Sequence, residues 1–213
     1  MKKGIIFDMD GTLWDSAPQV VESWNQTVKR MGYERKPLTV QDMQGVMGKT
    51  MDVLMKILFP DLGDAEREEL LERCGREENE YLREHGGTLY PKLRQTMESL
   101  KEAGYHLYIV SNCQSGYIEA FLEHYRFGDL IEDIECYGNN EKSKGENIAL
   151  LYQRNQLEDA VYVGDIQGDY DSSKEAGIRF IHAAYGFGTI REQVPKIAAF
   201  EELPKAVANV FEA

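Results

Sequence analysis

The chain has 213 residues, a length that allows one domain or one domain with a sizeable insertion. Hydrophobic residues make up 42% of the chain and charged residues 29%, as in ordinary globular proteins, so bulk disorder is excluded. The 24 lysine and arginine residues stand against 37 aspartate and glutamate residues, and the net charge of −13, with no basic stripe, argues against binding to nucleic acid or to an anionic membrane surface.

The first predicted element is a strand over residues 4–8, in which three apolar residues end at Asp8. This stretch is too short for the apolar core of a signal peptide, and no later run approaches the roughly 18 apolar residues of a membrane span. The cysteines lack the paired spacing of a metal or redox motif; they are Cys74, Cys113 and Cys136. We therefore expect a protein of the reducing cytoplasm.

The next part of the chain carries helical patterns and no convincing strand. Helices are expected over residues 16–31, 39–46 and 49–59, followed by a long amphipathic helix from about residue 64. In that last helix, apolar residues recur on one face, while glutamate and arginine cover the opposite face. We predict that residues 15–87 form a helical module inserted after the first strand, with Gly86-Gly87-Thr88 as the return hinge.

Beyond the insertion, short apolar runs alternate with longer amphipathic ones. The pattern predicts strands over residues 105–111, 160–165 and 178–183, and helices over residues 91–103, 115–124, 143–154 and 169–176. The strands are almost continuously apolar, which is typical of a parallel sheet buried on both faces. The predicted fold class is therefore α/β, with a Rossmann-like parallel sheet core over residues 1–14 and 88–213.

Two carboxylates close the first strand, in the sequence Phe7-Asp8-Met9-Asp10-Gly11-Thr12. Residues two apart in an extended chain share a face, so the side chains of Asp8 and Asp10 should point the same way. Ligands of α/β sheets bind at the carboxyl ends of the strands, which makes this pair a candidate site. Taken alone, the motif also fits an Asx-type turn that caps the chain reversal before Gly11.

A second pair of carboxylates, Asp165 and Asp169, follows the strand predicted over residues 160–165. Capping of the next helix would explain Asp169 but not Asp165. If these acids lie beside Asp8 and Asp10, like charges about 4 Å apart repel by about 4 kcal/mol at an effective dielectric near 20, so the cluster needs a cation or protonation. Oxygen ligands without a histidine or cysteine pair favour a hard ion, above all Mg²⁺.

Three further residues suit an anionic substrate. Ser111 and Asn112 end a core strand just before a predicted helix, and a hydroxyl, an amide and a helix N-terminus can together hold a phosphate; ordinary capping is the alternative. Lys144 lies in the first turn of the next predicted helix, within a capping box. Because a cation is unfavourable there, Lys144 should have a role other than stability, which ranks it above its neighbour Lys142.

In this order, the four segments resemble the haloacid dehalogenase-like hydrolase superfamily. They are Asp8-x-Asp10-Gly11-Thr12, Ser111-Asn112, Lys144 and Gly164-Asp165-x-x-x-Asp169. The similarity runs from near Gly4 to near Gly188 and is strongest to the phosphoglycolate phosphatase and β-phosphoglucomutase branch. The helical module resembles the C1-type cap domain of that family, so the resemblance implies that residues 15–87 close over a small substrate.

The resemblance implies a covalent mechanism. Asp8 would be the nucleophile that attacks phosphorus and forms an aspartyl-phosphate. Asp10 would protonate the leaving oxygen and then deprotonate the water that hydrolyses the intermediate. The dehalogenase branch generally lacks an acid two residues after its nucleophile, so cleavage of a carbon–halogen bond is a poor fit.

The resemblance also implies a Mg²⁺ site at the strand ends. The side chains of Asp8 and Asp165 and the backbone carbonyl of Asp10 would bind the ion. Asp169 would lie beside them, in contact with the ion through water or orienting Lys144.

The remaining motif residues would hold the substrate. Ser111 and Lys144 would bind the phosphoryl oxygens, and the Met9 amide and Asn112 would complete the phosphate seat. In the cap, Lys49 lies in a segment that resembles the loop reaching into the active site in this branch, where it could contact the leaving group. A solvated lysine at a helix start is the alternative for Lys49.

The resemblance therefore implies a Mg²⁺-dependent phosphatase of a small phosphorylated metabolite. A phosphomutase shares every core residue and differs in whether a sugar phosphate intercepts the aspartyl-phosphate before water does. A non-catalytic binding module is a further alternative, although a pure binder gains nothing from four mutually repelling acids. For partners we expect no nucleic acid and no membrane, and the chain should be a monomer or a weak homodimer.

Overall fold

A six-stranded sheet forms the centre of the computed structural model, which describes residues 1–212. Its strands lie in the order β5-β4-β1-β6-β7-β8, and each neighbouring pair is parallel. The strands are β1 (Lys3–Phe7), β4 (His106–Ser111), β5 (Ile131–Cys136), β6 (Asp159–Gly164), β7 (Arg179–Ala183) and β8 (Lys196–Ile197). All six strands therefore run in the same direction, and their carboxyl ends lie on the same side of the sheet.

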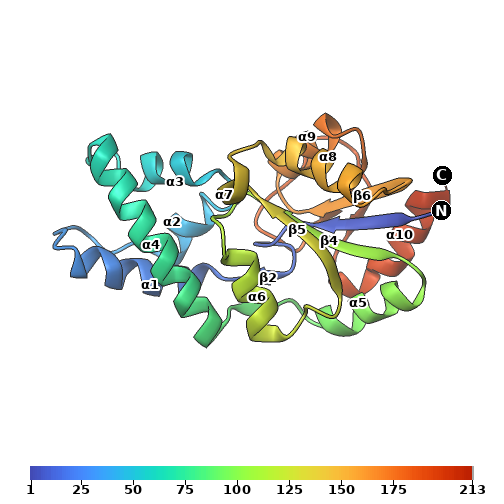
Figure 1. Cartoon of the computed structure of the whole chain (residues 1–213), viewed down its shortest axis with the longest axis horizontal. Coiled ribbons are helices and arrows are strands. Elements are labelled where there is room, and N and C mark those ends of the chain that lie inside the picture. The colour runs from blue at the N-terminus through green and yellow to red at the C-terminus, as the bar shows by residue number, and fades with distance from the viewer. Residues whose placement is uncertain (213) are drawn as a thin grey trace.

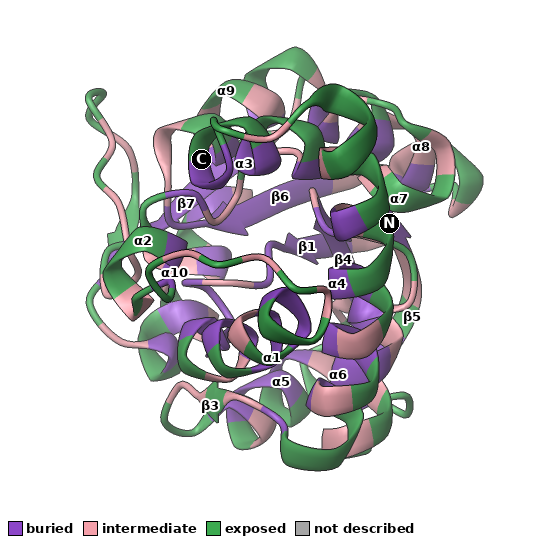
Figure 2. Ribbon diagram, turned by 90° about the vertical axis from the view of Figure 1, so that its left-hand side faces the viewer, coloured by how far each residue is buried: buried purple, intermediate pink, exposed green. Residues whose placement is uncertain are grey.

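Helices cover both faces of this sheet. Figure 1 shows two on one side, α8 (Lys144–Arg154) and α9 (Gln167–Glu175), and two on the other, α5 (Leu93–Glu102) and α10 (Leu203–Glu212). Successive residues of β1 alternate between two hydrophobic cores: Ile5 and Phe7 belong to one, whereas Ile6 packs in the other with Ile148 and Leu151 of α8. The strands at the centre of Figure 2 are accordingly buried. Burial on both faces explains the almost continuous apolar runs, and the predicted α/β fold is confirmed.

A second group of helices lies beyond the carboxyl ends of the strands. It consists of α1 (Ala17–Arg30), α2 (Val40–Gln44), α3 (Met51–Leu58) and α4 (Asp64–His85). Figure 1 shows this helical group to the left of the sheet, on the side away from both chain termini. α1 packs along α4, and α4 packs against α6 (Tyr117–Tyr125), the helix that follows β4. The four helices lie close to the bounds that the sequence predicts for them.

The acidic strand β5 is not predicted from the sequence. Its sequence, from Ile131 to Cys136, contains three acids and resembles a loop more than a buried strand. β5 is an edge strand, where charged residues are tolerated and protect against unwanted pairing. Arg154 of α8 covers it, with ion pairs to Asp133 at 2.8 Å and to Glu135 at 2.9 Å.

The two segments that connect the helical group to the sheet pair with each other. They form a short antiparallel ladder between β2 (Trp14–Asp15) and β3 (Thr88–Leu89). The sequence predicts a return hinge at Gly86-Gly87-Thr88 and no strand at either place, because two-residue strands leave no periodic pattern. As a result, both crossings to the helical group lie side by side.

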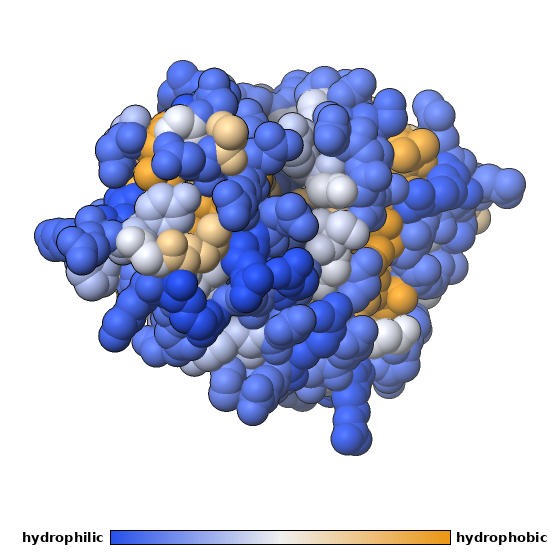
Figure 3. All heavy atoms as spheres, turned by 60° about the vertical axis from the view of Figure 1, so that its left-hand side comes forward, coloured by the Kyte–Doolittle hydropathy of each residue, from blue (hydrophilic) through white to orange (hydrophobic). Residues whose placement is uncertain are grey.

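Polar residues dominate the outside of the molecule. Figure 3 shows the face that includes the helical group, which hydrophilic residues largely cover. Within residues 1–212 the exposed large apolar side chains are Met1, Val53 and Ile57. In this described part of the chain, no helix combines the length and apolarity needed to cross a membrane. The elements not yet placed are the short helix α7 (Tyr137–Asn140) and a 3₁₀ turn over Phe200–Glu202.

Candidate active site

The acids predicted at two strand ends lie together. β1 pairs directly with β6, and the backbone N–H of Asp8 extends the ladder by donating to the carbonyl of Val163 at 2.9 Å. Carboxylate oxygens of Asp8, Asp165 and Asp169 lie within 4.8 Å of one another, and all three residues are buried. The structure thus places the two strand tips side by side, as the sequence analysis expects.

A tight turn after β1 brings these acids close. The N–H of Leu13 donates to the carbonyl of Met9 at 2.8 Å, and that of Gly11 donates to the carbonyl of Trp14 at 2.9 Å. Gly11 has a φ of +83°, and a Cβ at this position would lie 2.1 Å from Oδ2 of Asp165. Any side chain there would strain the backbone and displace Asp165, so the motif requires glycine.

Asp10 is held by two hydroxyl groups. Its Oδ1 accepts a hydrogen bond from Ser16 Oγ at 2.6 Å and from the Tyr117 hydroxyl at 2.8 Å. Asp10 is thus fixed by other side chains and not by the backbone of its own turn, which argues against the Asx-type turn. Neither partner is predicted from the sequence, because Ser16 has the position of an ordinary helix cap and Tyr117 lies 107 residues from Asp10.

Lys144 reaches the acid cluster from the start of α8. Its Nζ donates to Oδ1 of Asp8 at 2.9 Å and to Oδ1 of Asp169 at 2.7 Å, and the residue is only 3% exposed. The predicted capping box is present: Ser143 accepts from the N–H of Glu146, whose side chain accepts in return from the N–H of Ser143. Lys142 is exposed, so Lys144 is the lysine that the structure brings to the cluster.

Asp169 supports this arrangement from the first turn of α9. Its Oδ2 accepts from the backbone N–H groups of Asp165 and Ile166 at 3.0 and 3.1 Å. Asp169 is therefore the third residue of the helix, and a cap at Asp169 itself, the alternative in the sequence analysis, is wrong. α9 begins at Gln167, earlier than predicted, because Asp169 folds back to bond the residues before the helix.

The predicted substrate-binding residues surround the same place. Ser111 ends β4 and is buried, at 5% exposed. The Asn112 amide nitrogen donates to the carbonyl of Gly48 in the helical group at 2.9 Å, so Asn112 bridges the two parts of the molecule. Lys49 follows this contact and is exposed. α6 begins at Tyr117 and not at residue 115, because Gly116 adopts a left-handed φ of +88° before it.

Burial and like charge set the proton affinities of these groups. Burial, with a further contribution from Asp169, raises the pKa of Asp8 to about 7, although Lys144 opposes the change. Burial, then the charges of Asp169 and Asp8, raises the pKa of Asp165 to about 8. Burial also raises the pKa of Asp10 to about 6, against the hydrogen bonds that it accepts. Burial disfavours charged Lys144, but Asp169 and Asp8 hold its pKa well above the usual value.

Without bound metal, the protein is expected to lose thermal stability as the pH rises from about 5 to about 8. The pKa values of Asp8 and Asp165 are higher in the folded chain than in the unfolded chain, so the folded chain binds more protons in this range. The resulting stabilisation is complete below the unfolded pKa near 4 and is lost as the pH passes about 7 and about 8. Melting temperatures measured in EDTA test this, and a melting temperature that stays level or increases over the range would contradict it.

The acid cluster fits a hard divalent cation. Oδ1 of Asp165 is buried without a hydrogen-bond partner, whereas its Oδ2 accepts from the N–H of Phe187 at 2.7 Å. One ammonium group, that of Lys144, contacts the cluster, so an excess of negative charge remains if Asp8, Asp165 and Asp169 are ionised. At 4.8 Å and an effective dielectric near 20, each carboxylate pair repels by roughly 3.5 kcal/mol. A cation would reduce this repulsion and bind the free oxygen, and an all-oxygen donor set suits a hard ion.

A small cavity of about 40 Å³ opens beside these acids, between the sheet and the helical group. Asp10, Ser111 and Asn112 line it from the sheet side, and Trp24, Lys49 and Glu78 line it from the helical group. A space of this size holds very few water molecules.

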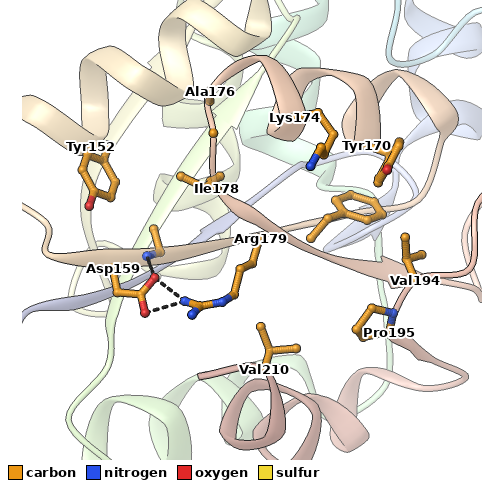
Figure 4. Close-up of a pocket in the computed structure, with 13 residues that line it drawn as sticks. Tyr152, Asp159, Tyr170, Lys174, Ala176, Ile178, Arg179, Val194, Pro195 and Val210 are labelled. Atoms are coloured by element: carbon orange, nitrogen blue, oxygen red, sulfur yellow. Dashed lines mark hydrogen bonds and ion pairs between the residues drawn. The ribbon is translucent and has the colours of Figure 1, made fainter. Parts of the chain in front are cut away.

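A second cavity, of about 780 Å³, lies where β6 and β7 begin, at the opposite end of the strands (Figure 4). Arg179 and Asp159 form an ion pair at its wall, and Tyr152 and Tyr170 also line it. None of the clustered acids borders this space. Because ligands of α/β sheets bind at the carboxyl ends of the strands, the smaller cavity marks the candidate active site.

Known proteins are similar in sequence to most of this chain. The model of the haloacid dehalogenase-like hydrolase family matches residues 5–183. The phosphoglycolate phosphatase of Aquifex aeolicus is 30% identical over 198 residues, which cover 90% of this chain and 89% of the relative.

Solved structures with the same fold include two bacterial proteins. A predicted phosphoglycolate phosphatase from Haemophilus somnus 129pt superimposes with a TM-score of 0.81 at 23% identity, covering 97% of this chain and 98% of that one. A variant of CbbY from Rhodobacter sphaeroides, solved in complex with xylulose-(1,5)-bisphosphate, has a TM-score of 0.77 at 16% identity, covering 95% and 96%. At these identities the likeness concerns the fold alone.

Proposed function

Because the chain belongs to the haloacid dehalogenase-like hydrolase family, we propose that it is a Mg²⁺-dependent phosphatase that hydrolyses a small phosphorylated metabolite through an aspartyl-phosphate. The observation that carries this proposal is the buried contact of Lys144 with Asp8, next to the unpaired Oδ1 of Asp165. A carboxylate beside an ammonium group and a free oxygen for a cation is equipped to attack an anionic phosphoryl group. Relatives that match most of the chain are named phosphoglycolate phosphatase, which supports this reaction class.

In the first step, a carboxylate oxygen of Asp8 forms a bond to phosphorus as the ester bond between phosphorus and the leaving oxygen breaks. Asp10 gives its proton to that oxygen, so the product leaves as an alcohol. The raised pKa of Asp10, about 6, keeps part of the population protonated near neutral pH. Lys144 and Ser111 hold the phosphoryl oxygens and offset their charge.

In the second step, water attacks the phosphorus of the aspartyl-phosphate. Asp10, now a carboxylate, accepts a proton from the water, and the bond between phosphorus and Asp8 breaks. Inorganic phosphate leaves, and Asp8 returns to its starting form. Ser16 and Tyr117 keep the Asp10 carboxylate in one position for both proton transfers.

The side chains of Asp8 and Asp165 and the backbone carbonyl of Asp10 are the proposed Mg²⁺ ligands. When bound, the ion would neutralise charge on the phosphoryl group and on the carboxylates. Asp169 has a different role, because Lys144 and two backbone N–H groups already occupy both of its oxygens. We therefore assign Asp169 to orienting Lys144 next to the metal site.

We also propose that residues 15–87 form a cap that opens to admit the substrate. Asp8 is only 1% exposed, so the phosphoryl group cannot reach it in this closed arrangement. The hydrogen bond between Asn112 and the Gly48 carbonyl joins the cap to the sheet beside the acids. Because β2 and β3 place both connections side by side, the cap can swing about that ladder as one body.

The Asp165→Asn variant should show opposite effects on metal binding and on metal-free stability. Asparagine keeps an oxygen to accept from Phe187 but loses the charge that faces Asp8. In EDTA at about pH 9, where the parent acid is mostly ionised, we expect a higher melting temperature, by about 2–4 °C for each kcal/mol of repulsion removed. The stabilisation of the parent by added Mg²⁺ should be largely lost in the variant. Equal Mg²⁺ stabilisation of both proteins would remove Asp165 from the metal site.

Phosphate release from acetyl phosphate and from a panel of phosphorylated metabolites, measured with Mg²⁺ and with EDTA, tests the proposed function. We expect turnover that depends on Mg²⁺ and that leaves a phosphoryl group covalently bound to Asp8 in acid-quenched samples. Absence of turnover for every compound would indicate a binding module instead. Conversion of a hexose 1-phosphate to the 6-phosphate without free phosphate would indicate a phosphomutase.

A further inference from the structure

Glu78 of α4 is a buried acid without a cation. The residue is 3% exposed, and within residues 1–212 it forms no ion pair. Its Oε2 accepts a hydrogen bond from Nε1 of Trp24, and the Gln114 amide adds a second interaction. Burial raises the pKa of Glu78 to about 7 despite both interactions, and the charge of Asp10 adds to the increase. Glutamate is rarely this buried without a cation, so its place needs another explanation.

The small cavity beside the acids connects Glu78 with the proposed reaction centre. Asp10 and Ser111, the proposed acid and one phosphoryl ligand, line the same space as Glu78. Several of the other lining residues are apolar: Val20, Trp24, Met43, Met47, Met51 and Leu54. If the phosphoryl group contacts Asp8, Lys144 and Ser111, the group esterified to it extends into this cavity, toward Glu78.

Two residues that line this cavity each have a buried amide oxygen without a hydrogen-bond partner. Oε1 of Gln114 is buried and unpaired, while its Nε2 donates to Oδ1 of Asn79 at 3.0 Å. Oδ1 of Asn112 is likewise buried and unpaired, while its Nδ2 is engaged with the Gly48 carbonyl. Hydrogen bonds thus fix which end of each amide is free. Buried acceptors without donors are costly, and a ligand that brings donors would satisfy them.

We propose that Glu78, together with Gln114 and Asn112, selects a leaving group that carries hydrogen-bond donors and excludes one that carries a carboxylate. This inference rests on the proposed phosphatase function and names the class of its substrate. A hydroxyl or ammonium group at the end of a short chain would donate to the acceptors of the wall. A carboxylate would meet acceptors and a further carboxyl group. Lys49, the one cation of the lining, attracts a carboxylate only weakly because its side chain is exposed to water. The chain should therefore differ in preference from relatives named phosphoglycolate phosphatase.

Three phosphate esters of equal length test this preference. They are 2-phosphoglycolate, 2-hydroxyethyl phosphate and O-phosphoethanolamine, which end in a carboxylate, a hydroxyl and an ammonium group. With Mg²⁺ at about pH 8.5, where the Glu78 carboxyl is ionised, kcat/KM of the parent should be about 10²-fold higher, or more, for at least one donor ester than for 2-phosphoglycolate. The comparison of the hydroxyl and ammonium esters identifies which donor the wall prefers.

The Glu78→Gln variant should reduce that ratio by about tenfold or more, because it removes the charge but keeps an acceptor for Trp24. Glu80→Gln, an exposed site on the same helix, is the matched control and should leave the ratio unchanged. If Glu78 had only a structural role, Glu78→Gln would change kcat/KM for all three esters by the same factor. An unchanged ratio in Glu78→Gln, or a parent that prefers 2-phosphoglycolate, would overturn the proposal.

Binding to the Asp8→Asn protein separates this inference from the proposed function. Calorimetric titration with the same three esters should give the same order of affinity. Adding the Glu78→Gln change should reduce the difference in affinity between the donor esters and 2-phosphoglycolate. If the parent does not hydrolyse even acetyl phosphate, the proposed phosphatase function is wrong. The order of affinities still tests whether Glu78 selects the leaving group. Equal affinity for the three esters would refute the selection even in an active phosphatase.

Discussion

The Asp8→Asn variant is expected to lower kcat/KM for acetyl phosphate by about 10⁴-fold or more, the largest loss of any single substitution in this chain. Asparagine has the same shape and keeps an oxygen that can accept from Lys144, so the site should stay assembled. Its amide is a very weak nucleophile toward phosphorus, and the covalent step is lost. The measurement is phosphate release under saturating Mg²⁺, together with the covalently bound phosphate in quenched samples.

Asp171→Asn is the matched control for this loss. Asp171 lies on α9, close in sequence to Asp169, but is exposed to solvent. The control should retain the parent rate and the covalent phosphate. If Asp8→Asn kept more than a few per cent of the parent activity, Asp8 would not be the nucleophile, and direct attack by water would have to be considered.

The parts of the fold that follow from local chemistry were open to prediction. Apolar strands of almost continuous pattern mark a sheet buried on both faces, and Gly104 and Gly177 adopt the left-handed φ values of +88° and +72° expected after helices. The turn at Gly11 is also local, because the glycine lies between the acids that require it. Strand β5 was missed because at a sheet edge the charge of its residues no longer distinguishes a strand from a loop.

The rest of the site depends on contacts between residues distant in sequence. Tyr117 binds Asp10 from another part of the chain, and no pattern around either residue indicates the pairing. Glu78 is harder still, because its neighbours Glu77 and Glu80 are also glutamates on a helix rich in charge. Only the packing of α4 distinguishes them: Glu77 pairs with arginines, Glu80 is exposed, and Glu78 faces the cavity.

The Asp10→Asn variant should lose activity in proportion to the difficulty of the leaving group. General acid catalysis contributes about 10²–10⁴-fold, so hydrolysis of an alkyl phosphate such as 2-hydroxyethyl phosphate should fall by about that factor. Acetyl phosphate has a leaving group that needs no proton, so its first step should be much less affected. Because the second step still lacks its base, covalent phosphate on Asp8 should accumulate with acetyl phosphate in this variant.

The hydroxyl groups that hold Asp10 provide a graded version of the same experiment. Tyr117→Phe removes one donor to the carboxylate and leaves the acid in place, so the loss should follow the same order of leaving groups but be smaller. Losing that hydrogen bond should also raise the pKa of Asp10, because the bond favours the charged form. Since Asp10 acts as an acid in the first step, the alkaline limb of the pH profile of kcat/KM should shift upward. An Asp10→Asn variant that slowed both substrates equally and accumulated no covalent phosphate would show that Asp10 only supports the site. In that case the proton must come from another group or from water.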